Sequence, residues 1–176
     1  FNGLASIMAI LALIGFALIA YQVGDEQLVG LCLILSASIL GFFWVNWPFG
    51  RIFLGDGGSY FVGFSLAWVA VMLVERNPKI SAFAALLICV HPVTEVLFSI
   101  YRRQIKELHP VHPDKMHFHS LIKQRYVRRW FSGISTDGRN SITGLLVGLM
   151  TLTAGILANL AYQSVWMSMI ILVDFL

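Results

Sequence analysis

The chain has 176 residues and a formal net charge of +3, and 58% of its residues are hydrophobic whereas only 12% are charged. Soluble globular domains contain roughly 45–50% apolar and about 25% charged residues, so the composition excludes an ordinary water-soluble domain. The small net charge points only weakly to anionic partners.

Six apolar runs follow one another along the chain. Crossing a hydrocarbon core of ~30 Å takes about 20 helical residues, and a segment in lipid must satisfy its backbone amides internally. Each run is therefore predicted to be a helix, and the expected fold class is all-α, a polytopic transmembrane bundle of about six spans. The runs cover residues 4–20, 28–45, 60–74, 80–100, 142–160 and 162–176.

Polar connections join the runs, and the basic residues are distributed unequally between the two sides of the membrane on which these connections would lie. The connections cover residues 21–27, 46–59, 75–79 and 101–141. With alternating spans, segments 46–59 and 101–141 share one side, which carries ten basic residues against Arg76 and Lys79 on the other. The positive-inside bias places the basic side in the cytoplasm. The ten are Arg51, Arg102, Arg103, Lys106, Lys115, Lys123, Arg125, Arg128, Arg129 and Arg139.

The two ends of the chain bear on domain organisation. The sequence starts at Phe1 without an initiator methionine, and it stops at Leu176 inside an apolar run. We therefore expect residues 1–176 to form a single transmembrane domain, the C-terminal part of a larger polytopic protein. Small residues at Gly144-xxx-Gly148 and Gly63-xxx-Ala67 mark places where helices could approach closely.

A glycine-rich segment precedes the third run and reads Phe53-Leu54-Gly55-Asp56-Gly57-Gly58-Ser59. Its glycines allow a close approach of the backbone to a bound group, and Ser59 is expected to cap the following helix. Asp56 offers the hard oxygen that Mg²⁺ takes from one or two carboxylates beside phosphates and water. A tight Asp-Gly turn with a serine cap remains the alternative.

A histidine-rich segment lies in the long polar connection, with His109, His112, His117 and His119 beside Asp114 and Lys115. Because His117 and His119 are two residues apart, they would not share a helix face, so contact with a phosphorylated ligand fits better than metal chelation. A solvated interfacial loop is the alternative.

After the histidines, apolar and basic side chains are interleaved, which predicts a helix at the membrane interface within segment 101–141. A cluster this close to the bilayer disfavours nucleic-acid binding. The side chains are Phe118, Leu121, Ile122, Tyr126, Trp130 and Phe131, alternating with Lys123, Arg125, Arg128 and Arg129.

His91, Pro92 and Glu95 interrupt the fourth apolar run. His91 and Glu95 are four residues apart and could pair on one helix face, while Pro92 would bend the helix or open its hydrogen bonding. Charged groups inside a membrane usually face the protein interior or a water-filled cavity. Helix packing and an ion path both remain open for this group.

These groups, in this order, resemble the polyprenyl-phosphate N-acetylhexosamine-1-phosphate transferases (glycosyltransferase family 4), and most closely the undecaprenyl-phosphate N-acetylglucosamine-1-phosphate transferases. The matching residues are Phe53 to Ser59, Pro92 with Glu95, Arg102-Arg103, Pro113-Asp114 and His117-Phe118-His119-Ser120-Leu121. Phe1-Asn2-Gly3-Leu4 is similar to the end of an Asp-Gly-x-Asn-Gly-Leu segment of that family. Ser120 stands where the family commonly has a histidine, and Glu95 where it has an aspartate.

The resemblance covers only the C-terminal half of the family's fold, and the family's paired aspartates would precede Phe1. The segment by itself is therefore not expected to be active. For the whole enzyme, the resemblance implies transfer of a sugar 1-phosphate from a UDP-N-acetylhexosamine to a polyprenyl phosphate, with Mg²⁺ required. This step would start lipid-linked glycan synthesis at the cytoplasmic face of the bacterial inner membrane.

The resemblance also implies roles for individual residues. Asp56 would bind the metal ion, and His117 and His119 would be catalytic residues that contact the nucleotide sugar. The further candidates for substrate binding are Asp114, Lys115, Arg102, Arg103, Gly55, Gly57 and Asn2.

Homo-oligomer formation stays open, as do two rival functions. One rival is a transporter with an ion path through His91 and Glu95. The other is a non-catalytic segment that packs against other membrane helices.

Overall fold

The computed structural model describes residues 1–105 and 117–175, without the side chain of Arg103, and this part of the chain is helical with no strand. The predicted all-α fold class is confirmed. The elements are α1 (Leu4–Gln22), α2 (Glu26–Asn46), α3 (Gly55–Arg76), α4 (Ala82–Ile88), α5 (Val90–Ile105), α6 (Phe118–Ile122), the π-helical turn η1 (Lys123–Val127), α7 (Arg128–Trp130), α8 (Thr136–Ala161) and α9 (Val165–Phe175).

Helices α1, α2, α3 and α8 are long and apolar enough to cross a membrane. The fourth apolar run forms two helices, α4 and α5, which are bent by 79° and would count as one further span. Helix α9 has only 11 residues, fewer than the about 20 that a full crossing needs. Within the described ranges, the six predicted runs therefore give four full-length helices, a bent pair and a short helix.

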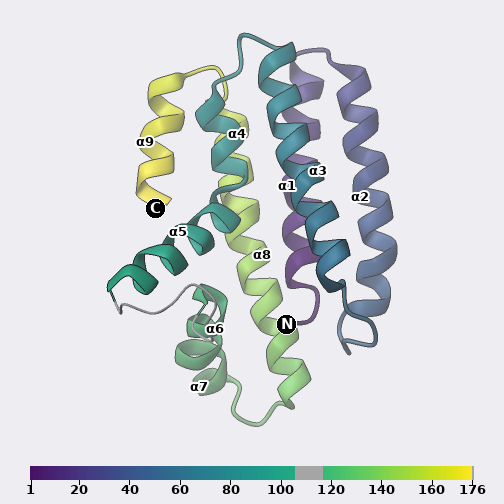
Figure 1. Ribbon diagram of the computed structural model, residues 1–176, viewed down its shortest axis with the longest axis vertical. Coiled ribbons are helices and arrows are strands. Elements are labelled where there is room, and N and C mark those ends of the chain that lie inside the picture. The colour runs from purple at the N-terminus through teal and green to yellow at the C-terminus, as the bar shows by residue number, and fades with distance from the viewer. Residues whose placement is uncertain (106–116, 176) are drawn as a thin grey trace.

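The bend between α4 and α5 has a cause in the sequence. Proline has no N–H, and its ring clashes with the carbonyl four residues earlier. For Pro92 that carbonyl belongs to Ile88, which is the last residue of α4. The expected bend at Pro92 is thus present, and it turns α5 away from the bundle (Figure 1).

Helix α1 is the central helix of the bundle and contacts α2, α3, α4 and α8. Its buried side chains include Leu13, Phe16 and Ile19. Helix α8 approaches α1 through glycines: a Cβ atom at Gly144 would lie 2.8 Å from the backbone oxygen of Asn2, and one at Gly148 would collide with Ile7. The predicted close approach at these two glycines is confirmed. A Cβ atom at Gly63 would meet nothing within 4 Å in the described structure.

The two ends of the bundle differ in character (Figure 1). Loop 47–54, helices α6 and α7 and the start of α8 lie together at one end, which we call the histidine end. The connections after α1, α3 and α8 lie at the opposite end, where the N–H of Ser81 donates to the carbonyl of Tyr162 at 2.8 Å. The described parts of segments 46–59 and 101–141 therefore lie at one end, and segments 21–27 and 75–79 lie at the other, as predicted.

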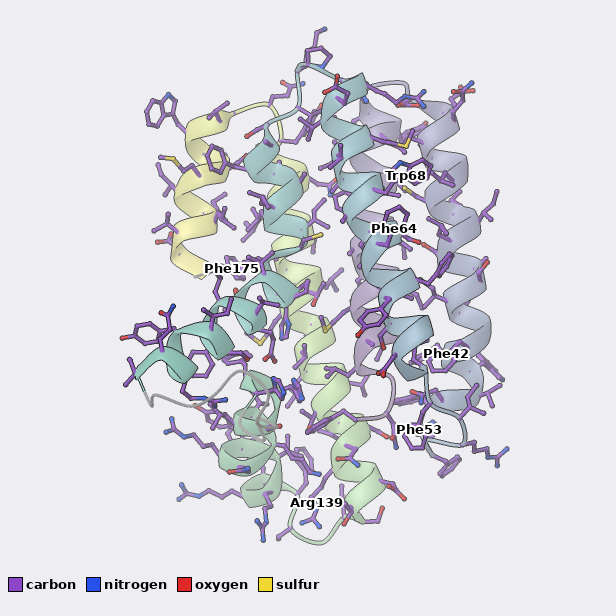
Figure 2. The ribbon with its side chains drawn as sticks, viewed as in Figure 1. Phe42, Phe53, Phe64, Trp68, Arg139 and Phe175 are labelled. Atoms are coloured by element: carbon purple, nitrogen blue, oxygen red, sulfur yellow. The ribbon has the colours of Figure 1, made fainter. Side chains whose placement is uncertain are left out.

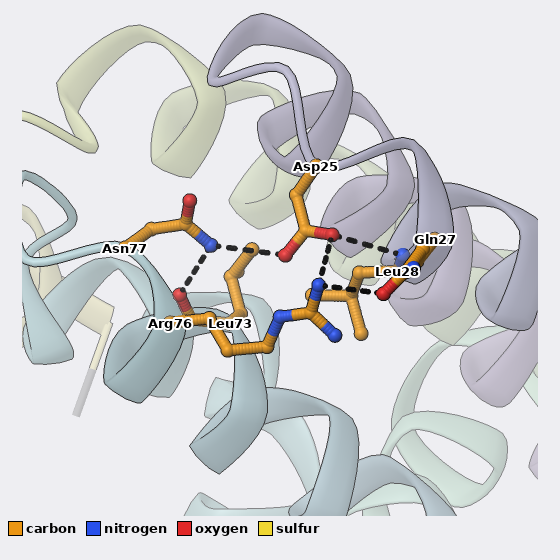
Figure 3. A network of polar contacts seen from close by, with 6 residues as sticks. All are labelled: Asp25, Gln27, Leu28, Leu73, Arg76 and Asn77. Carbon is orange, nitrogen blue, oxygen red and sulfur yellow. Dashed lines mark hydrogen bonds and ion pairs between the residues drawn. The ribbon is translucent and has the colours of Figure 1, made fainter.

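At the opposite end, Asp25 joins helices α2 and α3 (Figure 3). Its carboxylate caps α2 by accepting from the N–H of Leu28 at 3.2 Å, and it also accepts from Arg76 Nη2 at 2.9 Å and Asn77 Nδ2 at 3.3 Å. Only 7% of the Asp25 side chain is exposed, against 38% for Arg76. The α1–α2 turn is thus held against the end of α3.

Candidate active site

Asp56 lies in the first turn of α3, which begins at Gly55 with a φ of 67°. The helix begins before the predicted run, so Ser59 is not its cap: the Ser59 hydroxyl donates to the carbonyl of Gly55 at 2.7 Å inside the helix. Asp56 and Gly57 are exposed. The side chain of Asp56 is therefore accessible to a cation, and the positive end of the helix dipole favours negative charge in the first turn.

The loop that precedes Asp56 is held by Asn46, a buried residue at the end of α2. The Asn46 amide oxygen accepts from the N–H of Gly3 at 2.6 Å, and its amide nitrogen donates to the carbonyl of Ile52 at 2.6 Å. The amide nitrogen of the buried Asn2 donates to the carbonyl of Pro48 at 2.8 Å. Residues 1–3 therefore fix the position of loop 47–54.

Helix α8 supports the same loop. The hydroxyl of Ser141 donates to the carbonyl of Pro48 at 2.7 Å. A Cβ atom at Gly50, whose φ is 63°, would lie 2.7 Å from the Asn2 amide oxygen. Phe53 in the loop and Arg139 on α8 lie at this same end (Figure 2). The glycine at position 50 thus allows the loop to close over Asn2.

The histidines are organised by Glu95 of α5. Glu95 Oε1 accepts from the backbone N–H of His119 at 3.1 Å and lies at hydrogen-bond distance, 2.8 Å, from the ring Nδ1 of His119. Glu95 Oε2 accepts from the backbone N–H of Phe118 at 3.1 Å and lies 3.6 Å from the ring Nδ1 of His117. The two imidazole rings are stacked with centroids 5.3 Å apart. One carboxylate therefore holds the start of α6 and both histidines.

The histidines contact the N-terminal segment through Phe1. The Phe1 ring lies edge-on to His119 with centroids 4.5 Å apart, and Lys123 Nζ lies 5.2 Å from the Phe1 centroid. Residues 1–3 therefore contact both the histidine group and loop 47–54. We use "site end cluster" for Phe1, Asn46, Glu95, His117 and His119.

Lys123 brings positive charge to this cluster. Its ammonium donates to Asn140 Oδ1 at 2.5 Å. Burial, followed by the nearby charges of Arg139 and Arg128, lowers the pKa of Lys123 below its ordinary value. Cations held this close together repel one another, and a phosphate group placed among them would relieve that repulsion.

A small apolar cavity opens beside the Asp56 segment. It has a volume of about 170 Å³ and lies between α1, α3 and the α4–α5 bend. Leu54 and Ser59, which flank Asp56, line it together with Pro92. The cavity therefore connects the glycine-rich segment with the bend that precedes Glu95.

The described part of the protein offers few ligands to a metal ion. Residues 1–105 and 117–175 contain no group of three or more His, Cys, Asp or Glu side chains that could hold one. Asp56 offers a single exposed carboxylate. This donor set fits Mg²⁺, which commonly takes one or two carboxylates and completes its shell with phosphate oxygens and water. It does not fit a closed zinc site.

The remaining predicted substrate-binding residues divide into three kinds. Asn2 is buried and uses its amide within the protein, and Arg102 packs its guanidinium 5.5 Å from the centroid of the Phe98 ring. The side chain of Arg103, and Asp114 and Lys115 entirely, lie outside the described residues. Of the predicted set, the structure brings His117 and His119 together. Asp56 lies in the first turn of α3, and α3 begins at the end of the bundle where α6 lies (Figure 1).

Two residues of the site end cluster were not expected from the sequence in these roles. Glu95 was predicted to pair with His91, but within the described ranges both ring nitrogens of His91 lack a hydrogen-bond partner, and Glu95 bonds to α6 instead. Asn46 was placed only as the first residue of a loop. In both cases the sequence shows a polar residue within an apolar helix. Burying such a side chain costs free energy unless another segment supplies its hydrogen-bond partners.

The chain is similar to known N-acetylglucosaminyl 1-phosphate transferases. Residues 1–74 match the family described as Glycosyl transferase family 4. The chain is 28% identical over 165 residues to an undecaprenyl-phosphate alpha-N-acetylglucosaminyl 1-phosphate transferase of Haemophilus influenzae, covering 89% of this chain and 44% of the relative. It is 30% identical over 129 residues to the transferase of the same name from Escherichia coli K12, covering 69% of this chain and 35% of the relative.

A protein of Yersinia pestis with that name also matches at 30% identity over 129 residues, covering 69% of this chain and 35% of the relative. The chain therefore spans less than half the length of these curated relatives. No solved structure matches it.

Proposed function

We propose that this chain is part of an enzyme that transfers N-acetylhexosamine 1-phosphate to polyprenyl phosphate. The proposal is supported by the match of residues 1–74 to glycosyl transferase family 4 and by the similarity to the curated transferases. In the proposed reaction, a phosphate oxygen of the lipid attacks the β-phosphorus of a UDP-N-acetylhexosamine. The bond between the β-phosphorus and its bridging oxygen breaks, and that oxygen leaves with UMP. The product is a polyprenyl diphosphate sugar.

The single observation that supports this role is the contact of one short segment with both candidate regions. Phe1 touches His119, and Gly3 donates to Asn46, which holds the loop before Asp56. A reaction between two phosphorylated substrates needs a cation site and donors to phosphate at the same place. Helix α3, whose first turn carries Asp56, begins at the end of the bundle where α6 lies (Figure 1), which supports the proposal.

Each residue receives a role that its surroundings allow. Asp56 would hold Mg²⁺, which when bound offsets the repulsion between the two substrates' phosphates. His117, whose side chain is 41% exposed, and His119 would contact the diphosphate of the nucleotide sugar. Lys123 would add positive charge beside them.

We place this end at the cytoplasmic face of a bacterial inner membrane. Arg125, Arg128 and Arg129 lie in the described segment at this end, and a soluble nucleotide sugar can meet a lipid phosphate only at a membrane surface. The segment 117–131 would lie at headgroup level, because Tyr126 and Trp130 are exposed beside Arg128 and Arg129. Brominated lipids should quench the fluorescence of a variant with Trp130 as its one tryptophan, and unchanged emission would contradict this placement.

Asp56→Ala tests the function itself. The protein is expressed from its full coding sequence, and membranes are given a radiolabelled UDP-N-acetylhexosamine with undecaprenyl phosphate and Mg²⁺. Loss of the carboxylate that holds the cation should lower the rate of transfer to lipid at least about 10²-fold. Removing one group that stabilises charge in a transition state commonly lowers kcat by about this factor. The protein should still insert in the membrane.

Asp137→Ala is the matched control, because Asp137 is also exposed in the first turn of a helix at the same end. It should retain transfer. Equal activities of the Asp56 and Asp137 variants would contradict the metal role. Absence of lipid-linked product from the unaltered protein with any UDP-N-acetylhexosamine would contradict the proposed function.

A further inference from the structure

Glu95 makes an unusual number of contacts for a single carboxylate in an apolar bundle. It receives two backbone N–H groups, from Phe118 and His119, and the ring Nδ1 of His119. Only 15% of its side chain is exposed. Charge-assisted hydrogen bonds of this kind are roughly twice as strong as neutral ones. Glu95 is therefore a fixed group rather than a mobile surface carboxylate.

The contact with His119 determines where the imidazole carries its proton. Both oxygens of Glu95 accept from backbone N–H groups, which favours the ionised carboxylate. An ionised carboxylate can only accept hydrogen bonds, so with Glu95 ionised the 2.8 Å contact places the proton on Nδ1 of His119. In neutral imidazole the other nitrogen, Nε2, is then left without a proton. A carboxylate partner fixes the tautomer and the ring orientation of a histidine in this way.

The neighbours of His119 limit rotation of its ring. His117 stacks on it with an angle of 6° between the rings, and Phe1 packs edge-on at 4.5 Å. The side chain of His119 is 17% exposed. The ring therefore has a defined orientation as well as a defined proton position.

We propose that Glu95 is a positioning residue that acts through His119: it keeps the proton on Nδ1 and leaves Nε2 as the nitrogen available to the phosphorylated ligand. This inference rests on the proposed function for its consequence in catalysis, but the tautomer of His119 is a property of the protein alone. Glu95 connects α5 with α6, so the bend before it also contributes to the orientation of His119.

Substitutions at position 95 separate positioning from folding. Glu95→Gln keeps one oxygen that can still accept from the N–H and Nδ1–H of His119, whereas Glu95→Leu keeps none. Gln104→Leu is the control on the same helix, because Gln104 is exposed near the end of α5. All variants are made in the protein expressed from its full coding sequence and placed in lipid nanodiscs.

The first measurement is nitrogen NMR of histidine-labelled protein, with the His119 signals assigned through a His119→Asn variant. The unaltered protein, Glu95→Gln and Gln104→Leu should show His119 protonated on Nδ1 and bare on Nε2. Glu95→Leu should shift His119 to the Nε2-protonated form that is common in water. A proton on Nε2 in the neutral ring of the unaltered protein, or an unchanged tautomer in Glu95→Leu, would overturn the proposal.

The second measurement is transfer of the labelled sugar phosphate to undecaprenyl phosphate. Glu95→Leu should lower kcat about 10²-fold, the lower scale of what a positioned acid–base group contributes, and Glu95→Gln should restore most of that loss. Full kcat in Glu95→Leu would overturn the catalytic part of the proposal. If the unaltered protein gives no transfer, the proposed function fails while the NMR result still decides the link between Glu95 and His119.

Discussion

At the scale of single residues, the site is held by two polar side chains that bond to segments far away in the sequence. Asn46 reaches Gly3 and Ile52, and Glu95 reaches the first residues of α6. A buried donor or acceptor without a partner costs about 1–3 kcal/mol. Substituting either residue is therefore expected to lower the stability of the protein.

Asn46→Leu should destabilise the protein by about 1–3 kcal/mol, because it leaves the N–H of Gly3 and the carbonyl of Ile52 without their partner. The melting temperature in detergent micelles is the measurement. Ser38→Ala on the same helix is the control, since Ser38 is exposed and, among the described residues, its hydroxyl donates only to the carbonyl of Ile34 within α2. A melting temperature of Asn46→Leu equal to that of the control would show that Asn46 does not hold the loop.

At the scale of helices, two local features determine how the elements pack. Pro92 removes the hydrogen bond to Ile88 and separates α5 from α4. Gly144 and Gly148 bring α8 against α1, where a Cβ atom at Gly144 would meet backbone rather than a movable side chain. Packing of backbone on backbone is the usual result of small residues spaced by four in membrane helices.

Gly144→Ala should lower the stability of the α1–α8 pair by about 1–3 kcal/mol, the cost of overpacking a tight contact. Gly155→Ala is a matched substitution on the same helix, where a Cβ atom meets nothing within 4 Å of the described structure. It should gain up to about 1 kcal/mol from the better helix propensity of alanine. Thermal unfolding of both variants in one detergent decides the matter, and equal shifts would refute the contact at Gly144.

At the scale of the whole molecule, the two ends of the bundle carry different polar groups. The histidine end carries the site end cluster, whereas the opposite end carries the Asp25–Arg76 ion pair (Figure 3). The described segments at the histidine end also contain the basic residues Arg51, Lys123, Arg125, Arg128, Arg129 and Arg139. An excess of Lys and Arg at one end is the property that sets the orientation of a membrane protein during insertion.

Cysteine labelling tests the proposed orientation. In a background without Cys32 and Cys89, Lys79→Cys should react with a membrane-impermeant maleimide added to spheroplasts, while Arg125→Cys should react only after the inner membrane is permeabilised. The reverse pattern would place the histidine end outside and exclude a cytoplasmic nucleotide sugar as its substrate.

The sequence by itself determined the helical fold class, which loops share an end of the bundle, and the helix bend that Pro92 causes between α4 and α5. These features follow from runs of apolar residues, from the distribution of charge and from a missing backbone donor, all of which act within one segment. The glycine pair at positions 144 and 148 was also readable, because its spacing is local.

Only the tertiary structure decided which distant groups meet. Glu95 and His119 are separated by 24 residues and Gly3 and Asn46 by 43, and no local pattern names the partner of a lone polar side chain. His91 was the nearest partner along the helix for Glu95, yet the start of α6 offers three donors at once. The arrangement that satisfies more buried hydrogen bonds is the one adopted, and that comparison requires the whole fold.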